Sequence, residues 1–178
     1  MITILRKILE FFGKTKWLIS LIVVLLLINF LMIKNSPVEF SKLNQSDNKY
    51  CILDLKFSYS HQIISDCLEN YGTEGRNRYF VFSLLDLIYP LIYSLLLGSL
   101  LYKLFFYSKY NPYLFALFAG FFDYIENAFL IYFTRNFPDI NEFFALLSSL
   151  ATSLKWSFII ISFISLFFGL VNLIRNKI

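Results

Sequence analysis

Four long apolar runs alternate with polar segments along the chain, and each run is a predicted membrane span. The runs cover residues from about 17 to 33, 79 to 106, 112 to 133 and 143 to 174. A helix needs about 20 predominantly apolar residues to cross the hydrocarbon core, with a lower limit of about 17. The first run is close to this limit. The second and fourth exceed it, so we expect them to tilt or to project from the bilayer.

Short polar turns separate the last three runs. Asn111-Pro112 lies between the second and third runs, and proline is well tolerated in the first turn of a helix. Pro138 follows the third run and prevents that helix from continuing. Short connections favour antiparallel neighbours. The pattern therefore predicts an all-α integral membrane four-helix bundle, formed by residues 1–178 as a single domain.

The loop between the first two spans, residues 34–78, is long enough to fold. Its stretch SYSHQIISDCLENYG has apolar residues at helical spacing, which predicts an amphipathic helix. Ser58 or Ser60 can cap the start of this helix, and Gly72 suits a left-handed backbone position just after its end. We expect this helix to cover the mouth of the bundle.

Both cysteines, Cys51 and Cys67, fall in this loop. An oxidising compartment would permit a disulfide. Closing a loop of this size would stabilise the fold by about 3 kcal/mol. Two separate thiols are an equally good interpretation, because the sequence does not show whether the sulfur atoms meet.

Composition agrees with the membrane interpretation. The chain is 58% hydrophobic and 16% charged, and its mean hydropathy is +0.64. Soluble domains are roughly 45–50% apolar and about 25% charged. The net charge of +4 is spread around the apolar runs and forms no continuous stripe. We therefore expect the lipid bilayer as the main partner and no nucleic-acid partner.

The distribution of lysine and arginine predicts the orientation in the membrane. A dense basic cluster precedes the first span, which we interpret as an uncleaved anchor, and such clusters resist translocation. Both termini are therefore expected in the cytoplasm, with the protein in the inner (plasma) membrane. The inner side then carries Arg6, Lys7, Lys14, Lys16, Lys103, Lys109, Arg175 and Lys177. The outer side carries Lys34, Lys42, Lys49, Lys56, Arg76, Arg78 and Arg135, offset by Glu39, Asp47, Asp54, Asp66, Glu69 and Glu74.

Ionisable residues inside the third span are the first functional signal. Such a residue costs about 2.5–3.5 kcal/mol on insertion scales, so it normally faces the bundle interior and has a partner. Asp123 shares one helical face with Glu126 and Asn127, three and four residues later. Ala116 and Gly120 precede it on the same side, and small residues allow a second helix to approach closely.

The second and fourth spans carry matching polar positions. Tyr79, Asp86 and Tyr93 recur every seven residues, and Tyr89 and Pro90 lie on the same face. Pro90 is expected to kink the second span, because it removes a backbone hydrogen bond. Lys155 lies roughly halfway along the fourth span and is the predicted counter-ion. The first span has only Ser20 and Asn29 as polar residues, so we expect it at the periphery.

These residues are expected to gather into one cluster. It would comprise Asp86, Tyr89, Tyr93, Asp123, Glu126, Asn127, Lys155 and Tyr79, with Arg76 or Arg78 at its outer lip. The leading interpretation is an outward-facing intramembrane pocket for a small or lipid-like ligand. One alternative is an enzyme that uses Asp86, Asp123 or Glu126 as acid and base. A second alternative is a structural or accessory subunit with a buried ion cluster.

No cofactor or metal ion is expected at this cluster. His61 is the only histidine, and no histidine–cysteine set has the spacing of metal ligands. The sequence sets neither the identity of the ligand nor the oligomeric state.

The order of these motifs also resembles a known family. YGTEGR followed by a tyrosine, then D..YP..Y, D..EN and a lysine in the last span is similar to a family of small four-span bacterial membrane proteins of uncharacterised function. The similarity extends from about Tyr59 to the end of the chain. It implies the same four-helix layout but no activity. It points to Tyr71, Gly72, Gly75, Arg76, Tyr79, Asp86, Tyr89, Pro90, Tyr93, Asp123, Glu126, Asn127 and Lys155.

Overall fold

The computed structural model describes residues 2–34, 51–106 and 109–175, and within these ranges the chain is helical and contains no strand. Several residues used in the orientation prediction lie outside the described residues: Glu39, Lys42, Asp47, Lys49 and Lys177.

The described helices follow one another in a simple order. They are α1 (Ile2–Phe12), α2 (Thr15–Lys34), the short 3-10 helix η1 (Leu53–Leu55), α4 (His61–Asp86), α5 (Tyr89–Leu104), α6 (Tyr113–Asn136) and α7 (Glu142–Arg175). Four stretches are long and apolar enough to cross a membrane: α2, the α4–α5 segment, α6 and α7. The all-α fold class is confirmed, and the predicted spans fall on these four stretches.

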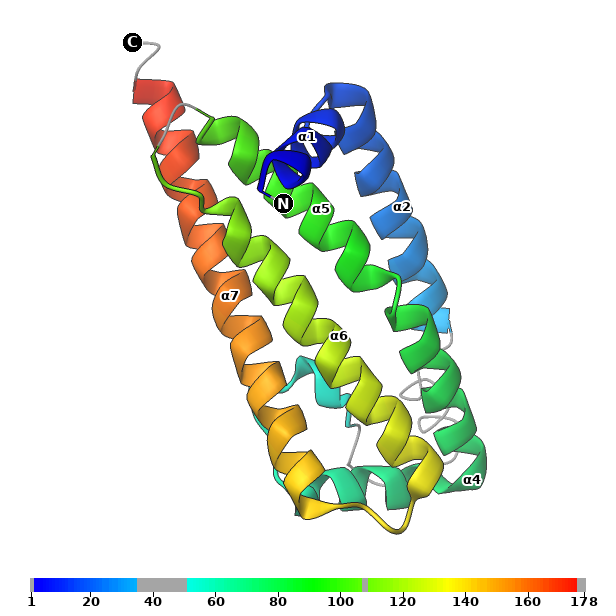
Figure 1. Cartoon of the computed structure of the whole chain (residues 1–178). Coiled ribbons are helices and arrows are strands. Elements are labelled where there is room, and N and C mark those ends of the chain that lie inside the picture. Colours follow the sequence, from blue (N-terminus) through cyan, green and yellow to red (C-terminus); the bar gives the residue numbers. More distant parts are fainter. Residues whose placement is uncertain (1, 35–50, 107–108, 176–178) are drawn as a thin grey trace.

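The two ends of the molecule differ in what they carry (Figure 1). The N-terminal helix α1 and the end of α7 lie at one end, which we call the terminal end. The crosswise first part of α4 and the connection from α6 to α7 lie at the opposite end, which we call the loop end. Helix α6 packs against both α5 and α7, and α2 packs mainly on α5.

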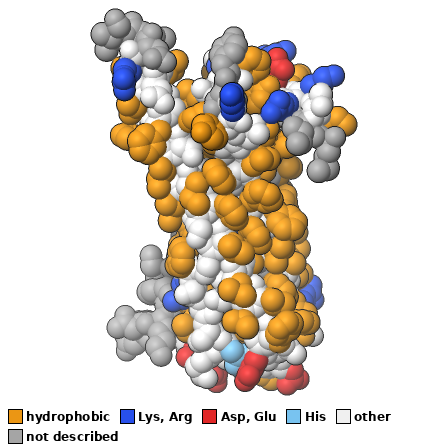
Figure 2. Space-filling model, turned by 60° about the vertical axis from the view of Figure 1, so that its left-hand side comes forward, with side chains coloured by type: hydrophobic (Ala, Val, Ile, Leu, Met, Phe, Trp, Pro, Cys, Tyr) orange, Lys and Arg blue, Asp and Glu red, His pale blue; other side chains and the backbone are white. Residues whose placement is uncertain are grey.

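The surface between these ends is apolar. On the face shown in Figure 2, hydrophobic side chains cover most of the length of the molecule. Lysine and arginine gather mainly at the terminal end, and aspartate and glutamate at the loop end. Large exposed side chains such as Phe163 and Phe167 on α7 are 57% and 64% exposed. Such a belt is the surface expected of a protein in contact with lipid.

The predicted second span consists of two helices joined by a break. Helix α4 ends at Asp86 and α5 begins at Tyr89, so the kink expected at Pro90 appears as an interruption just before it. Proline suits this position because the first turn of a helix has no intrahelical partner for its N–H groups.

The first part of α4 is the predicted amphipathic helix. The Ser60 side chain accepts a hydrogen bond from the backbone N–H of Ile63, so Ser60 is the cap. Gly72 has φ 62° and ψ −175°, and the chain turns sharply there into the span. The positive φ expected at Gly72 is therefore present, and a residue with a Cβ would be strained at it.

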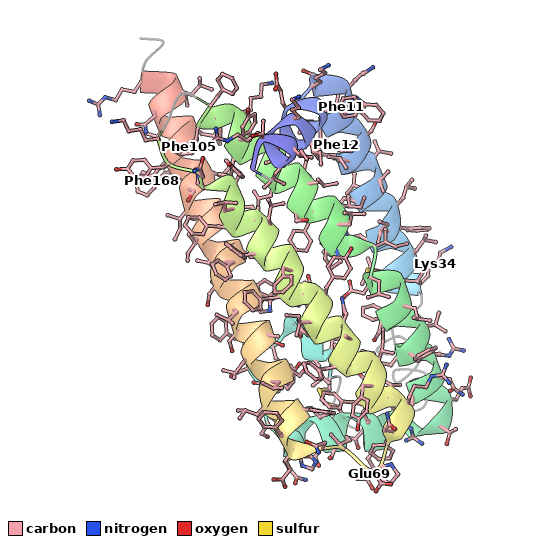
Figure 3. The ribbon with its side chains drawn as sticks, in the orientation of Figure 1. Phe11, Phe12, Lys34, Glu69, Phe105 and Phe168 are labelled. Atoms are coloured by element: carbon pink, nitrogen blue, oxygen red, sulfur yellow. A yellow bond between two sulfur atoms is a disulfide. The ribbon has the colours of Figure 1, made fainter. Side chains whose placement is uncertain are left out.

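Helix α2 ends well before the loop end. Lys34, its last residue, lies about level with the break between α4 and α5, while α4, α6 and α7 continue beyond it (Figure 3). Residues 51–60 lie in this outer part of the bundle, packed against α7 by the contacts described below.

Helix α1 was not predicted from the sequence, which indicated only a basic segment there. Its Leu9 is fully buried, in a cluster with Leu97 and Leu101 of α5. The Arg6 guanidinium donates to the Tyr113 hydroxyl over 3.3 Å and to the Asn111 side-chain oxygen over 3.1 Å. These contacts attach α1 to the start of α6.

Candidate ligand cavity and its buried polar network

A cavity of about 550 Å³ lies between α2, α5 and α7. Much of its length is lined by apolar side chains: Leu25, Met32, Leu96, Leu97, Leu100, Ile159, Phe163 and Leu166. Toward the loop end its lining becomes polar, with Asp54, Asp86, Tyr89, Tyr93, Asp123, Lys155 and Trp156. Cavities of about 300–1,000 Å³ with few polar groups are typical of small-molecule sites.

Lys155 is the centre of the polar end. Its Nζ lies 2.5 Å from Glu126 Oε2 and 3.5 Å from Asp123 Oδ1, and Lys155 is only 4% exposed. Both partners are on α6, so these ion pairs join α7 to α6. Buried charges are tolerated when they are paired and hydrogen-bonded in this way.

Asp123 has further partners on α5 and α6. The Tyr93 hydroxyl donates to Asp123 Oδ2 over 3.0 Å, and the Asn127 side-chain amide donates to Oδ1 over 3.4 Å. Gly120 lies one turn earlier. A Cβ there would be 2.9 Å from the Ser94 side chain and 3.2 Å from the Pro90 carbonyl. The absence of a side chain at Gly120 therefore brings α5 close enough for Tyr93 to reach Asp123.

Behind Lys155 the polar groups form a closed network. Thr152 Oγ1 donates to Glu126 Oε1 over 2.7 Å, and the Tyr59 hydroxyl lies 3.0 Å from Thr152 Oγ1 and 2.6 Å from Ser148 Oγ. Glu126, Thr152 and Ser148 are fully buried. These residues do not line the cavity, so this part of the cluster holds the helices in register.

Segment 51–60 is docked on α7 by its backbone. The Tyr59 N–H donates to Ser149 Oγ over 3.0 Å, and Ser153 Oγ donates to the Phe57 carbonyl over 2.9 Å. The Trp156 indole donates to the Asp54 carbonyl over 3.1 Å. These bonds satisfy backbone groups of an irregular segment that would otherwise be buried without partners.

A disulfide between Cys51 and Cys67 attaches the start of this segment to the amphipathic part of α4. The two Cα atoms are 5.6 Å apart, within the usual range for a disulfide. The sequence left open a disulfide or two separate thiols, and the structure contains the disulfide.

Docking of this segment brings Asp54 into the polar end of the cavity. Its Oδ1 atom is buried and has no hydrogen-bond partner in the described part of the chain. Burial raises the pKa of Asp54 to about 6; nearby Lys155 lowers it in part, and Asp123 raises it. Asp54 is therefore an acidic group whose charge depends on its surroundings close to neutral pH.

The cavity reaches the lipid-facing surface of the protein. Three of its lining residues are strongly exposed: Ile33 of α2 at 66%, Leu55 of η1 at 69% and Phe163 of α7 at 57%. They come from the walls on either side of the cavity and from the segment between them. We call these three residues the rim of the cavity. The rim is apolar and lies on the surface that faces lipid.

The structure separates the predicted site residues into two groups. Asp86, Tyr89, Tyr93, Asp123 and Lys155 line the cavity, whereas Glu126 and Asn127 lie behind it. Tyr79 is fully buried, packs between Tyr71 and Phe82, and does not itself line the cavity.

The two arginines expected at the outer lip lie elsewhere. Arg76 donates to the Leu68 carbonyl over 3.0 Å and lies over the ring of Phe137, whereas Arg78 pairs with Glu74 on the exposed side of α4. Neither lines the cavity. Gly72 turns α4 so that its basic side chains face the α6–α7 connection and the surface.

Sequence reasoning missed Asp54, Trp156 and Asn29 as lining residues. Asp54 was counted only as a charge of the outer loop, and no local pattern shows that its segment enters the bundle. Trp156 is adjacent to Lys155, and the helical turn of about 100° per residue places both at the cavity. Asn29 shows that α2 is not merely peripheral but forms one wall.

No family model, curated protein or solved structure matches this chain. The residues of the cavity and of the buried network are therefore the basis on which its function can be inferred.

Proposed function

We propose that this integral membrane protein binds a lipid-like amphiphile in the cavity between α2, α5 and α7. The polar head of the ligand lies beside Asp86, Asp123 and Lys155, and its apolar chain extends along α5 and α7 toward the terminal end. In this proposal both termini are in the cytoplasm of a bacterial cell, and the loop end lies outside the inner membrane.

The observation that carries the proposal is the two-part lining of one cavity. Carboxylates, a lysine and tyrosines occupy one end, and leucine, isoleucine and phenylalanine line the rest. A small polar solute would leave the apolar length unfilled, and a pure hydrocarbon would leave the buried polar groups without partners. An amphiphile matches both ends, and the apolar rim at Ile33, Leu55 and Phe163 offers it a route from the lipid.

Two features support the proposed orientation. The Cys51–Cys67 disulfide belongs to the loop end, and disulfides persist in oxidising compartments outside the cytoplasm. The basic residues on the face in Figure 2 gather at the terminal end, as expected for the cytoplasmic side. A single cysteine at the exposed position Glu69, in a variant without Cys51 and Cys67, tests this orientation. A membrane-impermeant thiol reagent should label it in cells with a permeabilised outer membrane and an intact inner membrane, and labelling only after the inner membrane is opened would contradict the orientation.

Tryptophan fluorescence tests binding directly. The chain has two tryptophans, Trp17 and Trp156, and only Trp156 lines the cavity. A Trp17→Phe variant in phosphatidylglycerol nanodiscs therefore reports on the cavity alone. Brominated single-chain amphiphiles, added at low mole fraction, quench a nearby indole. We expect quenching of Trp156 that saturates for at least one of an alkylamine, an alkyl alcohol and an alkyl sulfate.

A matched pair of variants separates cavity binding from contact with bulk lipid. Leu96→Phe with Leu100→Phe narrows the apolar part of the cavity without changing its polar end. Leu91→Phe makes the same change on α5 at a side chain that is 49% exposed and does not line the cavity. Saturable quenching should weaken in the first variant and persist in the second. Quenching that rises linearly with mole fraction in all three proteins would refute the proposed function.

A further inference from the structure

The polar end of the cavity carries more acidic than basic groups. Asp54, Asp86 and Asp123 line it, and Lys155 is the one cationic side chain of the lining within the described residues. Glu126 adds a fourth carboxylate directly behind the lysine, at 2.5 Å. The balance of formal charges is therefore negative on the side that a ligand head group would contact.

The charge of Lys155 is already taken up within the protein. Its ammonium group contacts Glu126 and Asp123 and lies 3.4 Å from the Asp54 carbonyl oxygen. An ammonium has three N–H donors, and these three oxygens account for all of them. Lys155 is therefore already neutralised within the protein, which makes it a poor partner for an anionic head group.

The carboxyl groups of Asp54 and Asp86 form no ion pair with a lysine or arginine in the described part of the chain. Asp54 Oδ1 is buried without a hydrogen-bond partner, and Asp86 is 5% exposed with the Asn127 amide as its neighbour. A buried carboxylate that lacks a cation is strongly unfavourable. A ligand that supplies positive charge would remove this cost.

Aromatic rings surround the same space. Tyr89, Tyr93 and Trp156 line the polar end, and the rings of Tyr89 and Tyr93 have their centroids 5.6 Å apart. Aromatic faces attract cations, and groups of such rings are used to recognise ammonium ligands. Acidic groups combined with aromatic rings are therefore a lining suited to an amine or a quaternary ammonium.

We infer that the amphiphile bound by this protein carries an ammonium group in its head, held between Asp54, Asp86 and the rings of Tyr89, Tyr93 and Trp156. This inference rests on the proposed function and adds the chemical class of the head group. The ligand ammonium pairs with carboxyl groups that form no ion pair with Lys155, so the ligand leaves the pairs of Lys155 with Asp123 and Glu126 in place.

The quenching experiment with three brominated probes of equal chain length tests the head group. Phosphatidylglycerol has no amine, so the host lipid does not compete for the site. We expect the alkylamine to reach half-saturation at a mole fraction at least ten times lower than the alkyl alcohol, and the alkyl sulfate to bind no better than the alcohol. A brominated phosphatidylethanolamine then distinguishes the ammonium of a zwitterionic lipid from that of a simple amine.

Neutralising variants assign the preference to the two carboxylates. Asp86→Asn and Asp54→Asn should each reduce the ten-fold preference for the amine, while Glu69→Gln, at the exposed far side of the loop end, should leave it unchanged (Figure 3). Two separate sites are used so that a folding defect in one variant does not decide the result.

The outcomes distinguish this inference from the proposed function. Saturable binding of the alcohol and the amine with equal strength, or tighter binding of the sulfate, would overturn the ammonium head and leave the amphiphile site standing. A preference for the amine that survives both substitutions would also overturn it. Saturable quenching by none of the probes would refute both.

Discussion

Helices α6 and α7 pack against each other along their length, but the two halves of their interface are held by different interactions. In the half nearer the loop end, which we call the ionic half, Lys155 and Thr152 of α7 bind Glu126 and Asp123 of α6. Ring contacts of Phe144 with Phe129 and Tyr132 accompany these polar contacts. In the half nearer the terminal end, the Phe158 ring lies between Phe115, Phe118 and Phe122, with centroids 5.5–6.2 Å apart. One helix pair thus combines an ionic and an aromatic interface.

The comparison shows that the same polar residues can specify how two membrane helices pair and line a cavity. Lipid competes well for apolar side chains, so aromatic contacts between helices gain mainly from close packing. Charged contacts are expensive to bury and therefore accept only the partner that neutralises them. The half that specifies the register is also the half that borders the cavity.

Removal of the lysine should have the largest effect on this comparison. Lys155→Met keeps a similar length but leaves Glu126 and Asp123 without their cation. The expected loss is about 3–5 kcal/mol in the free energy of unfolding, measured by denaturant titration in detergent. Glu126→Gln in the same protein should recover part of the loss, because it removes the closest unpaired charge.

Lys103→Met is the matched control for that substitution. Lys103 is an exposed residue in the last turn of α5, so a change within about 0.5 kcal/mol is expected. If Lys155→Met lowered the free energy of unfolding as little as Lys103→Met, the ion pairs of Lys155 would not stabilise the contact between α6 and α7.

The dependence of stability on pH should separate the two halves further. Burial raises the pKa of Asp54 from 3.8 to about 6, so between these values the folded state binds more protons than the unfolded state. Stability contributed at Asp54 is therefore present below pH 4 and lost as pH rises through 6. The loss is at most about 3 kcal/mol.

Asp54→Asn should remove this component, which is measured as the difference between the unfolding free energies of the two proteins from pH 4 to pH 7. If the free energies of unfolding of the two proteins changed with pH in the same way, Asp54 would titrate as a solvated carboxylate. Segment 51–60 would then not hold the Asp54 side chain in the cavity.

A substitution in the aromatic half should have the smallest effect. Phe158→Leu keeps an apolar side chain but removes the ring contacts, each worth about 0.5–1.5 kcal/mol. We expect a loss of about 1.5 kcal/mol, the lower end for three such contacts because leucine keeps part of the packing, and this loss should not change with pH. Phe167→Leu, at an exposed position of α7, serves as control. It removes a single ring contact, with the neighbouring Phe168, so its loss should be about 0.5 kcal/mol and smaller than that of Phe158→Leu. A loss as large as that of Lys155→Met would mean that close packing, and not charge, specifies the pairing.

Local patterns predicted much of this fold. The spans, the cap at Ser60, the positive φ of Gly72 and the interruption before Pro90 all follow from properties of a few neighbouring residues. The polar stripe of α6 could be predicted for the same reason. Asp123 and Glu126 are close in the sequence, and each is too costly in a membrane span without a partner.

The missed features depend on contacts between distant parts of the chain. Asp54 reaches the cavity because Ser149 and Ser153, about a hundred residues later, bind the backbone of its segment. Serines in a span look like ordinary small residues, so nothing local marks them as docking partners. Helix α1 could have been found from Leu5 and Leu9, which are one turn apart and pack on the same cluster.

The place of Lys155 in the last helix has a consequence for biosynthesis. The acidic groups Asp86 and Asp123 are made before it, so α4, α5 and α6 enter the membrane with carboxyls whose cation does not yet exist. A chain that stops before α7 keeps those groups without a counter-ion, and it also lacks the serines that receive segment 51–60. Insertion of α7 therefore supplies both the cation for the carboxyls of α6 and the hydroxyl groups that bind segment 51–60.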